Sequence, residues 1–576
     1  MLKGLLTSLL RGGKARAAEQ TPVPDIEQAV RRLQLHDVTG AARICELLLA
    51  RDPQLVKAWE LAGVAALNQG EYALARDRFE RALELSGDDA QALANAAEAN
   101  RRADRCDRAL ELIGRALALK PGFAPFLHIR VLALESAWRS EEALAACREA
   151  LVQHPDFARL YTSYFTLLNR AGADPGLIRD AHFRWAERFA APHTGDPRHC
   201  NPPQSERCLR IGYVSGDFRQ HAMSSFVLPL LEHHDRAQVE TYCYSNTPVT
   251  DDVTRRCELL AAHWRDIVAL SDAAADELVR GDGIDILVDL SGHTSGNRLG
   301  LFARKPAPLQ VTYLGYPGTS GLTQMDYRVT DARADPPGAG DAYYREQLLR
   351  LPHSLWCFAP PSQMPELVPL PALVAGHITF GSLNSAFKLT PHLVALWSRL
   401  LAALPDSKLV LAGIPAGTPR AGIAREFALN GIDTARLEFH AFLPAEEFWK
   451  LHGRIDIALD SFPSNGGATS CQTLWLGVPL VNLAGDTFLR RAGLSILTAV
   501  GLPELVAQSE DEYLRIACDL AGDRVRLARL RAGMRERMHA SPLLDAAAYT
   551  RDLEACYRTV WRKWCAHENA ARGGAC

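Results

Sequence analysis

Residues 460–475 read Asp460-Ser-Phe-Pro-Ser-Asn-Gly-Gly-Ala-Thr-Ser-Cys-Gln-Thr-Leu-Trp475, and they lead from the end of an apolar strand through a glycine pair into an amphipathic helix. Gly466 and Gly467 allow the backbone to approach a ligand closely. The free amides of the first helical turn and the helix dipole would then face an anion; these amides belong to Ala468, Thr469 and Ser470. The pattern predicts a diphosphate site, or alternatively a tight strand-to-helix turn without a ligand. It is neither a Walker sequence nor a G-x-G-x-x-G fingerprint.

Short apolar strands alternate with helical segments from Arg207 onward. The candidate strands are Leu209–Val214, Val239–Tyr244, Ile284–Asp289, Gln310–Leu314, His377–Gly381, Lys408–Ala412, Leu437–Ala441, Ile455–Asp460 and Pro479–Leu483. Such alternation is typical of doubly wound α/β domains, and the spacing predicts two of them. We expect the boundary in Ala359–Ala375, where five prolines oppose regular structure. Because ligands of such sheets bind at the carboxyl ends of strands, the loops that follow strands are the candidates for a site.

A second candidate loop is Phe380-Gly-Ser-Leu-Asn-Ser-Ala-Phe-Lys388, which leaves a predicted strand and ends on a cation. A lysine in this place can neutralise the charge that develops on a departing nucleoside diphosphate, a task that a metal performs in other enzymes. The chain contains no Asp-x-Asp element that would hold a divalent ion, so we expect neither a metal nor another cofactor. The alternative is that Lys388 is an ordinary solvated lysine.

Three further loops follow strands of the first α/β domain. The segment Ile211-Gly-Tyr-Val-Ser-Gly-Asp-Phe-Arg-Gln-His221 delivers a histidine that can take a proton from an attacking hydroxyl or orient a phosphate, unless it only makes a structural hydrogen bond. Two more loops, 291–296 and 314–321, leave the same edge of the sheet. We expect these two loops to line a cleft between the domains and to offer four residues to a donor sugar: His293, Gly315, Tyr316 and Pro317.

The first third of the chain repeats with a period of 34 residues. The repeating positions are Ala41, Ala75, Ala109 and Ala143; Cys45, Phe79, Ile113 and Cys147; Ala82, Ala116 and Ala150; and Pro53, Pro121 and Pro155, with Gly87 in the second unit. Small side chains let paired helices approach, the larger apolar residue fills the space between them, and proline ends the second helix. The pattern predicts four tetratricopeptide repeats over 22–155, followed by capping or linker helices over 156–205 that no longer keep the period. Stacked repeats form a concave surface suited to peptides or proteins, although a scaffold or dimerisation arm is the alternative.

The overall composition is that of a globular protein with several domains, because 48% of its 576 residues are apolar and 23% are charged. Lys plus Arg (64) nearly equals Asp plus Glu (67), which predicts no attraction to nucleic acid or to an anionic membrane. The 13 cysteines include no C-x-x-C pair, so we expect a reducing, cytoplasmic compartment. Residues 1–21 are interpreted as a basic tail and not as a signal peptide or a membrane span.

Taken together, these motifs resemble the O-linked N-acetylglucosamine transferases and their plant SPINDLY relatives, family GT41, which carry tetratricopeptide repeats before a two-domain GT-B catalytic core. The resemblance covers residues 22–560. It rests on four groups of residues: 212–218 with His221, 304–310 with 314–321, 384–388, and 465–475 with Gly477-Val-Pro479. It implies an α plus α/β fold, a helical solenoid followed by two Rossmann-like catalytic domains over 206–372 and 373–576, the latter including the C-terminal helices.

The resemblance also implies an inverting, metal-independent transfer of N-acetylglucosamine from UDP-N-acetylglucosamine to Ser and Thr hydroxyls of proteins recruited by the repeats. His221 matches the active-site histidine and Lys388 the lysine on the diphosphate. Asn465–Thr469 match the diphosphate loop, Gln472 a position that reaches the ribose, and Asn384 is expected at the donor with them.

Departures from the family pattern leave the donor open. Animal enzymes have His and Thr where this chain has Gly467 and Ala468, and Asp where it has Gln472. Gly292-His-Thr294 and the stretch 327–337 are closer to the plant branch, whose members can use GDP-fucose. Transfer of fucose to proteins, transfer to a glycan acceptor, and a non-catalytic scaffold that binds a nucleotide sugar are the remaining alternatives. A homo-oligomer is compatible with all of them.

Overall fold

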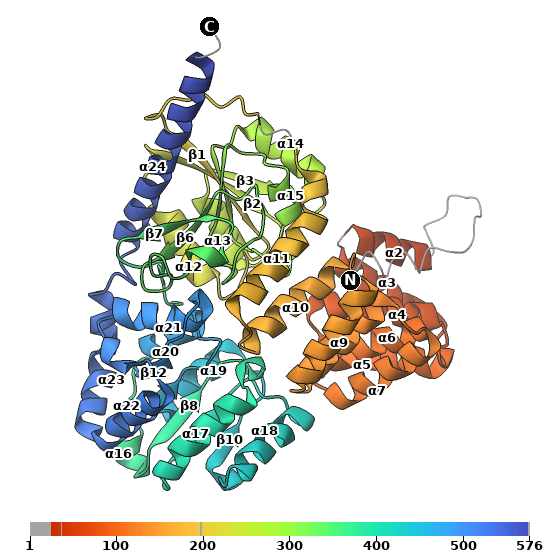
Figure 1. Cartoon of the computed structure of the whole chain (residues 1–576). Coiled ribbons are helices and arrows are strands. Elements are labelled where there is room, and N and C mark those ends of the chain that lie inside the picture. Colours follow the sequence, from red (N-terminus) through yellow and green to blue (C-terminus); the bar gives the residue numbers. More distant parts are fainter. Residues whose placement is uncertain (1–24, 36, 196–197, 574–576) are drawn as a thin grey trace. The chain divides into compact units, whose positions relative to one another are not determined.

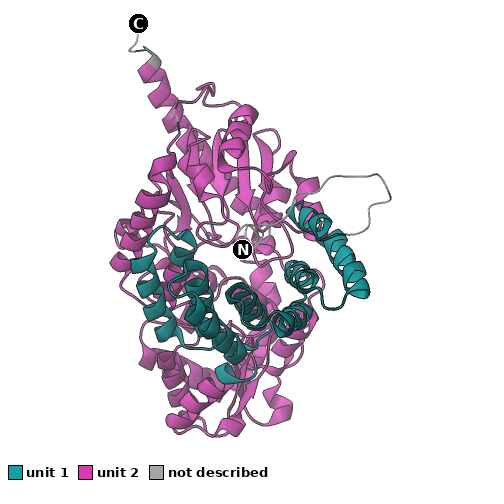
Figure 2. Cartoon of the chain, turned by 90° about the vertical axis from the view of Figure 1, so that its right-hand side faces the viewer, with its two compact units in different colours: residues 1–163, 416–419 teal, residues 164–415, 420–576 magenta. Residues whose placement is uncertain are grey.

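The structure of the protein is a computed structural model that describes residues 25–35, 37–195 and 198–573 (Figure 1). The tail expected over 1–21 lies outside these residues. The chain divides into two compact units, residues 1–163 with 416–419 and residues 164–415 with 420–576 (Figure 2). Helical repeats make up the first unit, and two parallel sheets make up the second, as the sequence predicts.

The helices of the first unit follow one another as antiparallel pairs. They are α2 (Ile26–Gln34), α3 (Val38–Arg51), α4 (Val56–Gln69), α5 (Tyr72–Ser86), α6 (Ala90–Arg102), α7 (Cys106–Leu119), α8 (Ala124–Ser136) and α9 (Ser140–Gln153). The alanine, large-apolar and second alanine series are all buried, with exposed fractions of 0 to 1%. A Cβ added at Gly63 would lie 2.8 Å from the Phe79 ring, which shows why a small residue is needed where helices of a pair meet.

The helical period continues further than the sequence series indicates. Helix α10 (Ala158–Arg170) begins 34 residues after α8, and α11 (Pro175–Phe189) begins 35 residues after α9. The expectation that the period ends near Pro155 is therefore wrong for the helices, although it holds for the small side chains. Leu177 stands where the alanine series would continue, and it is 37% exposed. From Tyr164 onward this segment belongs to the second unit, so its packing no longer requires the repeat residues.

The first sheet of the second unit has seven strands, all parallel, in the order β3-β2-β1-β4-β5-β6-β7. The strands are β1 (Leu209–Ser215), β2 (Val239–Ser245), β3 (His263–Asp266), β4 (Ile286–Asp289), β5 (Leu309–Thr312), β6 (Tyr327–Asp331) and β7 (Gln347–Leu351). Its helices are α12 (Ser224–His233), α13 (Asp252–Leu260), α14 (Asp272–Asp282) and α15 (Leu299–Ala303). The strand order reverses between β1 and β4, where sheets of this kind bind ligands.

The second sheet has six parallel strands in the order β10-β9-β8-β11-β12-β13 and reverses between β8 and β11. The strands are β8 (Thr379–Ser382), β9 (Lys408–Leu411), β10 (Leu437–Phe439), β11 (Ile457–Leu459), β12 (Leu480–Leu483) and β13 (Val506–Ala507). Its helices are α16 (Ala372–Ala375), α17 (Pro391–Ala403), α18 (Thr418–Leu429), α19 (Ala445–Leu451), α20 (Ala468–Trp475), α21 (Phe488–Ala499), α22 (Glu510–Gly522) and α23 (Arg524–His539).

All nine predicted strands are present, but four others were missed: β3, β6, β7 and β13. Strand β3 has the polar sequence His263-Trp-Arg-Asp266 at the edge of its sheet, and β13 is only two residues long. Strand β6 carries Arg328, which is fully buried because its guanidinium is used inside the fold. Polar residues of this kind hide the apolar pattern from which a strand is predicted.

The last helix, α24 (Ala546–Gly573), packs against the first sheet and its helices, although it follows the second sheet in the sequence. Its buried side chains include Leu553, Tyr557 and Trp561, and the Trp561 indole donates a hydrogen bond to the carbonyl of Gln204 at 3.0 Å. The chain therefore returns to the first sheet after completing the second (Figure 1). Within the described ranges, no helix combines the length and apolar character needed to cross a bilayer.

Candidate functional site

The loops after β8 and β11 meet at the reversal point of the second sheet, and the carboxylate of Asp460 holds them together. Its Oδ1 accepts a hydrogen bond from the Gly466 amide at 2.8 Å and another from the Asn384 side chain at 3.3 Å. Its Oδ2 accepts from Asn482 at the end of β12, at 2.9 Å. Burial raises the pKa of Asp460 to about 6, against the opposing effects of Lys388 and these donors. Asp460 is thus a central residue of this edge, a role that its place at the end of a predicted strand does not indicate.

Lys388 lies beside this carboxylate and connects the two loops directly. Its Nζ donates to the carbonyl oxygen of Asn465 at 2.7 Å, with a longer contact of 3.4 Å to Asn384 Oδ1. Burial lowers the pKa of Lys388 to about 8, and the positive charge of Arg170 adds to this effect while Asp460 opposes it. The structure therefore brings together three of the predicted residues, Asn384, Lys388 and Asn465.

The glycine loop is as tight as the sequence suggests. A Cβ at Gly466 would lie 2.2 Å from Ser470 Oγ and 3.2 Å from Asp460 Oδ1, so only glycine fits without displacement. Helix α20 starts after Gly467, and in the described part of the chain no side chain caps it, so the amides of its first turn receive no hydrogen bond from a capping side chain. The buried Oγ of Ser470 likewise has no hydrogen-bond partner among the described residues. These uncapped donors are suited to an anion.

The other residues around the glycine pair differ in their exposure to solvent. Ala468, Thr469 and Gln472 are partly exposed, whereas Asn465 and Ser470 are buried. The Asn465 side chain donates to the carbonyl of Ser461 at 2.9 Å, which holds the loop before the glycine pair. Exposed positions on α20 are thus free to contact a nucleotide, while the buried ones fix the backbone.

His221 follows β1 at the reversal point of the first sheet, and 39% of its side chain is exposed. Its Nδ1 lies 3.6 Å from Asp217 Oδ2 and accepts a hydrogen bond from the Met223 amide at 3.3 Å. Partial burial lowers the pKa of His221, whereas the carboxylate of Asp217 opposes the shift. The lowered pKa favours the neutral imidazole, the form in which it can accept a proton.

An aromatic contact chain connects the His221 loop to the glycine loop. Phe226, on the helix that follows His221, packs against Trp356, and the centroids of the two rings are 5.7 Å apart. Trp356 covers Gly467, where an added Cβ would lie 3.3 Å from the indole ring, and its Nε1 donates to Ser495 Oγ at 3.2 Å. Ser495, on α21, donates in turn to Asp331 at the end of β6. The carboxyl edges of both sheets therefore meet, through residues that the sequence analysis did not single out.

Two of the predicted sugar-loop residues point their side chains into a buried cluster. His293 donates from Nε2 to the carbonyl of Ser320 at 2.8 Å, and burial places its pKa well below the usual value. Tyr316 is 7% exposed, and its hydroxyl lies 2.7 Å from His182 Nε2 on α11. His182 uses its Nδ1 to donate to the Ile178 carbonyl, so Tyr316 is the donor in this pair.

The same cluster fixes the backbone of the loop that contains Gly315 and Pro317. The buried guanidinium of Arg328 donates to the carbonyls of Tyr316 and Gly318 at 3.0 and 2.8 Å. A Cβ at Gly315 would lie 1.9 Å from the carbonyl oxygen of Leu290, so the turn requires glycine. Gly315 and Pro317 stay partly exposed, whereas His293 and Tyr316 are buried.

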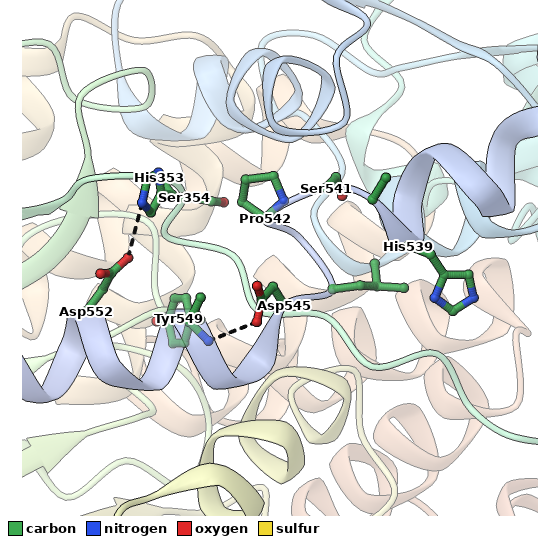
Figure 3. A pocket seen from close by; sticks show the side chains of 11 residues that line it. His353, Ser354, His539, Ser541, Pro542, Asp545, Tyr549 and Asp552 are labelled. Atoms are coloured by element: carbon green, nitrogen blue, oxygen red, sulfur yellow. Dashed lines mark hydrogen bonds and ion pairs between the residues drawn. The ribbon is translucent and has the colours of Figure 1, made fainter.

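A separate cavity of about 480 Å³ lies where β7, α23 and α24 meet (Figure 3). Its lining residues include His353, Tyr549 and Asp552. The Nε2 atom of His353 lies 4.0 Å from Oδ2 of Asp552. None of the predicted site residues lines it. In the part of the chain that the structure describes, no group of three or more His, Cys, Asp and Glu side chains is arranged to hold a metal ion.

Comparison with known proteins connects this geometry to one enzyme family. The profile of glycosyl transferase family 41 matches residues 192–365 and 370–553. A barley (Hordeum vulgare) protein named probable UDP-N-acetylglucosamine–peptide N-acetylglucosaminyltransferase SPINDLY is 39% identical over 407 residues, which are 69% of this chain and 43% of that protein. An Arabidopsis thaliana protein with the same enzyme name and the designation SEC is 32% identical over 371 residues, 62% of this chain and 37% of its own. The chain thus spans about two fifths of these curated relatives.

Among solved structures, a lysine-to-methionine mutant of the Thermobaculum terrenum O-GlcNAc transferase superimposes with a TM-score of 0.84 at 36% identity. The match covers 90% of this chain and 99% of that one. It therefore includes the helical repeats as well as both sheets.

Proposed function

Because this chain belongs to glycosyl transferase family 41, we propose that it transfers N-acetylglucosamine from UDP-N-acetylglucosamine to serine and threonine hydroxyls of proteins. The names of its relatives support this donor and this class of acceptor. The structural observation that carries the proposal is the contact of Lys388 with Asn465, which holds a cation beside the uncapped amides of α20. This is an arrangement for a diphosphate.

The transfer is proposed as a single inverting displacement. The acceptor oxygen forms a bond to the anomeric carbon on the side opposite the diphosphate, and the bond from that carbon to the diphosphate oxygen breaks. The electron pair leaves with the nucleoside diphosphate, where the Lys388 ammonium and the amides of Ala468–Ser470 stabilise the added charge. Because these groups supply the positive charge, the mechanism is proposed without a metal.

The acceptor proton requires a base at the edge of the first sheet. His221 is proposed for this role, or for orienting the donor phosphate, because it is exposed and its pKa is lowered. Gly315 and Pro317, which are partly exposed, are proposed to contact the sugar, and Gln472 the ribose. The repeats are proposed to recruit the protein acceptor through their stacked helices.

The donor is tested first by binding and then by transfer. Thermal unfolding is followed with UDP-N-acetylglucosamine, UDP-glucose, GDP-fucose, UDP and GDP, because a ligand that binds only the folded state raises the midpoint. The purified protein is then incubated with radiolabelled donors and a cell lysate, and label on proteins is counted. We expect stabilisation by UDP and UDP-N-acetylglucosamine and label from that donor alone.

The Lys388→Met protein serves as the control for contaminating activity, and Lys408→Met, on an exposed lysine of β9, as the matched surface control. Label from GDP-fucose in place of the uridine donor would replace the proposed substrate with fucose. Binding of a nucleotide sugar without transfer or hydrolysis would identify a scaffold. Transfer only to glycans would contradict a protein acceptor.

A further inference from the structure

The end of α10, the turn after it and α11 contact loops of both sheets within the second unit. A Cβ at Gly172, in the turn, would lie 3.3 Å from Pro463 in the loop after β11. Arg490, on α21, donates to the Ala173 carbonyl at 2.8 Å. On the other side, His182 holds Tyr316 in the loop after β5. The segment 164–189, called here the linker hairpin, is therefore built into the edge where the donor site lies.

The last residue of α10 is a cation directed at the donor loops. The guanidinium carbon of Arg170 lies 4.9 Å from the centroid of the Phe387 ring, and Phe387 immediately precedes Lys388. Burial lowers the pKa of Arg170 to about 10, and its charge is close enough to lower the pKa of Lys388. Two like charges that disfavour each other in a partly buried place are stabilised when an anion joins them.

The packing of Arg170 on Phe387 is also consistent with a purely structural contact, since arginine stacks on aromatic rings and a cation suits the end of a helix. The location of Arg170 beside the donor loops favours a role in ligand binding as well. Phe387 belongs to the same short 3-10 helix, Ala386–Lys388, as the diphosphate lysine, and the turn after Arg170 packs on the loop that leads to Gly466. The Arg170 guanidinium therefore contacts one of these two loops, and the turn directly after it contacts the other.

We propose that Arg170 is a donor-binding residue, whose guanidinium contacts the diphosphate of the nucleotide sugar together with Lys388. The linker hairpin thereby contributes to the donor site and is more than a connection to the repeats. Arginine is well suited to this task because its planar group offers several donors to phosphate oxygens. The inference rests on the proposed function, since it requires a nucleoside diphosphate in the site.

The test compares the affinity of full-length variants for UDP and for uridine by calorimetry. Arg170→Met removes the charge and keeps the apolar length, Arg170→Lys keeps the charge, and Arg184→Met on the exposed side of α11 is the matched control. We expect Arg170→Met to bind UDP about tenfold more weakly with unchanged uridine affinity. Arg170→Lys should recover part of the loss, and Arg184→Met should equal the wild type.

A pH profile separates a charge effect from a packing effect. The charged groups that act on Lys388 are Asp460 and Arg170. Removal of the Arg170 charge should raise the pKa of Lys388, so the loss of UDP binding in alkaline solution should begin at higher pH in Arg170→Met. A variant that only loosens the packing of the loop would not change the pH at which UDP binding begins to be lost.

The possible failures are distinguishable. If Arg170→Met binds UDP as the wild type does, or loses UDP and uridine affinity in parallel, the inference is wrong while the proposed function stands. If the wild type binds none of the nucleoside diphosphates, the proposed function itself is wrong. If Arg170→Met fails to fold, the affinities for UDP and uridine are compared between Arg170→Lys and Arg170→Gln instead. Equal UDP affinity of these two variants would overturn the inference.

Discussion

Lys388 Nζ donates a hydrogen bond to the carbonyl oxygen of Asn465 at 2.7 Å, across 77 positions of the sequence. This contact joins the loop after β8 to the loop after β11 at the reversal point of the second sheet. It also orients the ammonium at the start of α20, where, among the described residues, Ser470 Oγ has no hydrogen-bond partner and no side chain caps the helix. The site is therefore already organised before a donor is bound.

Replacing Lys388 by Met should reduce turnover by about 100-fold, because a positive group aimed at the leaving diphosphate is lost. Folding stability should stay the same or rise, since a cation with a pKa lowered by burial is removed. Steady-state kinetics and chemical denaturation measure the two effects, with Lys408→Met as the reference. Turnover of a well-folded Lys388→Met protein close to that of the wild type would refute the assigned role.

Binding of UDP should weaken as the pH rises through about 8. The pKa of Lys388 is lowered to about 8 in the free protein, so the ammonium that attracts the diphosphate is lost above this value. The folding stability of the ligand-free protein changes with pH in the opposite direction to UDP binding. Between pH 8 and the usual value of 10.5 the unfolded state binds more protons at this lysine, so its contribution to stability increases with pH. Calorimetry from pH 6.5 to 9.5 checks the binding, and a flat profile would contradict the assignment.

Gly466→Ala should abolish UDP binding and destabilise the protein, because the new Cβ would lie 2.2 Å from Ser470 Oγ. The double variant Gly466→Ala with Ser470→Ala should recover part of the stability, since it removes the atom in closest conflict; Asp460 Oδ1 at 3.2 Å keeps the recovery incomplete. Gly533→Ala is the control, because a Cβ on this helical glycine meets no atom within 4 Å. That control should be neutral or more stable, by roughly 0.5 to 1 kcal/mol. Strictly additive effects of the two substitutions would show that the conflict is not with Ser470.

Acid should destabilise the protein in part through His182, which is fully buried and whose pKa burial lowers to about 4. A group with a lowered pKa stabilises the fold above its ordinary value of 6.5, and this contribution is lost as the pH falls towards 4. Denaturation midpoints between pH 4 and 7 should therefore fall less steeply in His182→Gln than in the wild type. Equal slopes in the two proteins would show that His182 does not titrate with unfolding.

Local sequence patterns were sufficient to predict most of the helices and strands and the candidate loops. The alanine series at Ala75 and Ala109 indicates close helix packing, and the apolar runs indicate nine strands, because each pattern follows from the burial of residues within its own segment. The glycine loop and Lys388 were found because they directly follow predicted strands. These inferences need only local spacing.

The groups that come from distant parts of the chain to share one site are visible in the folded protein alone. Three contacts join residues that lie more than 130 positions apart in the sequence. They are the contact of Arg170 with Phe387, the hydrogen bond of His182 with Tyr316, and the packing of α24 on the first sheet. No local period records such contacts, because a polar side chain has the same appearance in the sequence whether it faces water or a buried partner. The hydrogen bonds of Asp460 show the same limit, since its role follows from four donors brought together by folding and not from its place at a strand end.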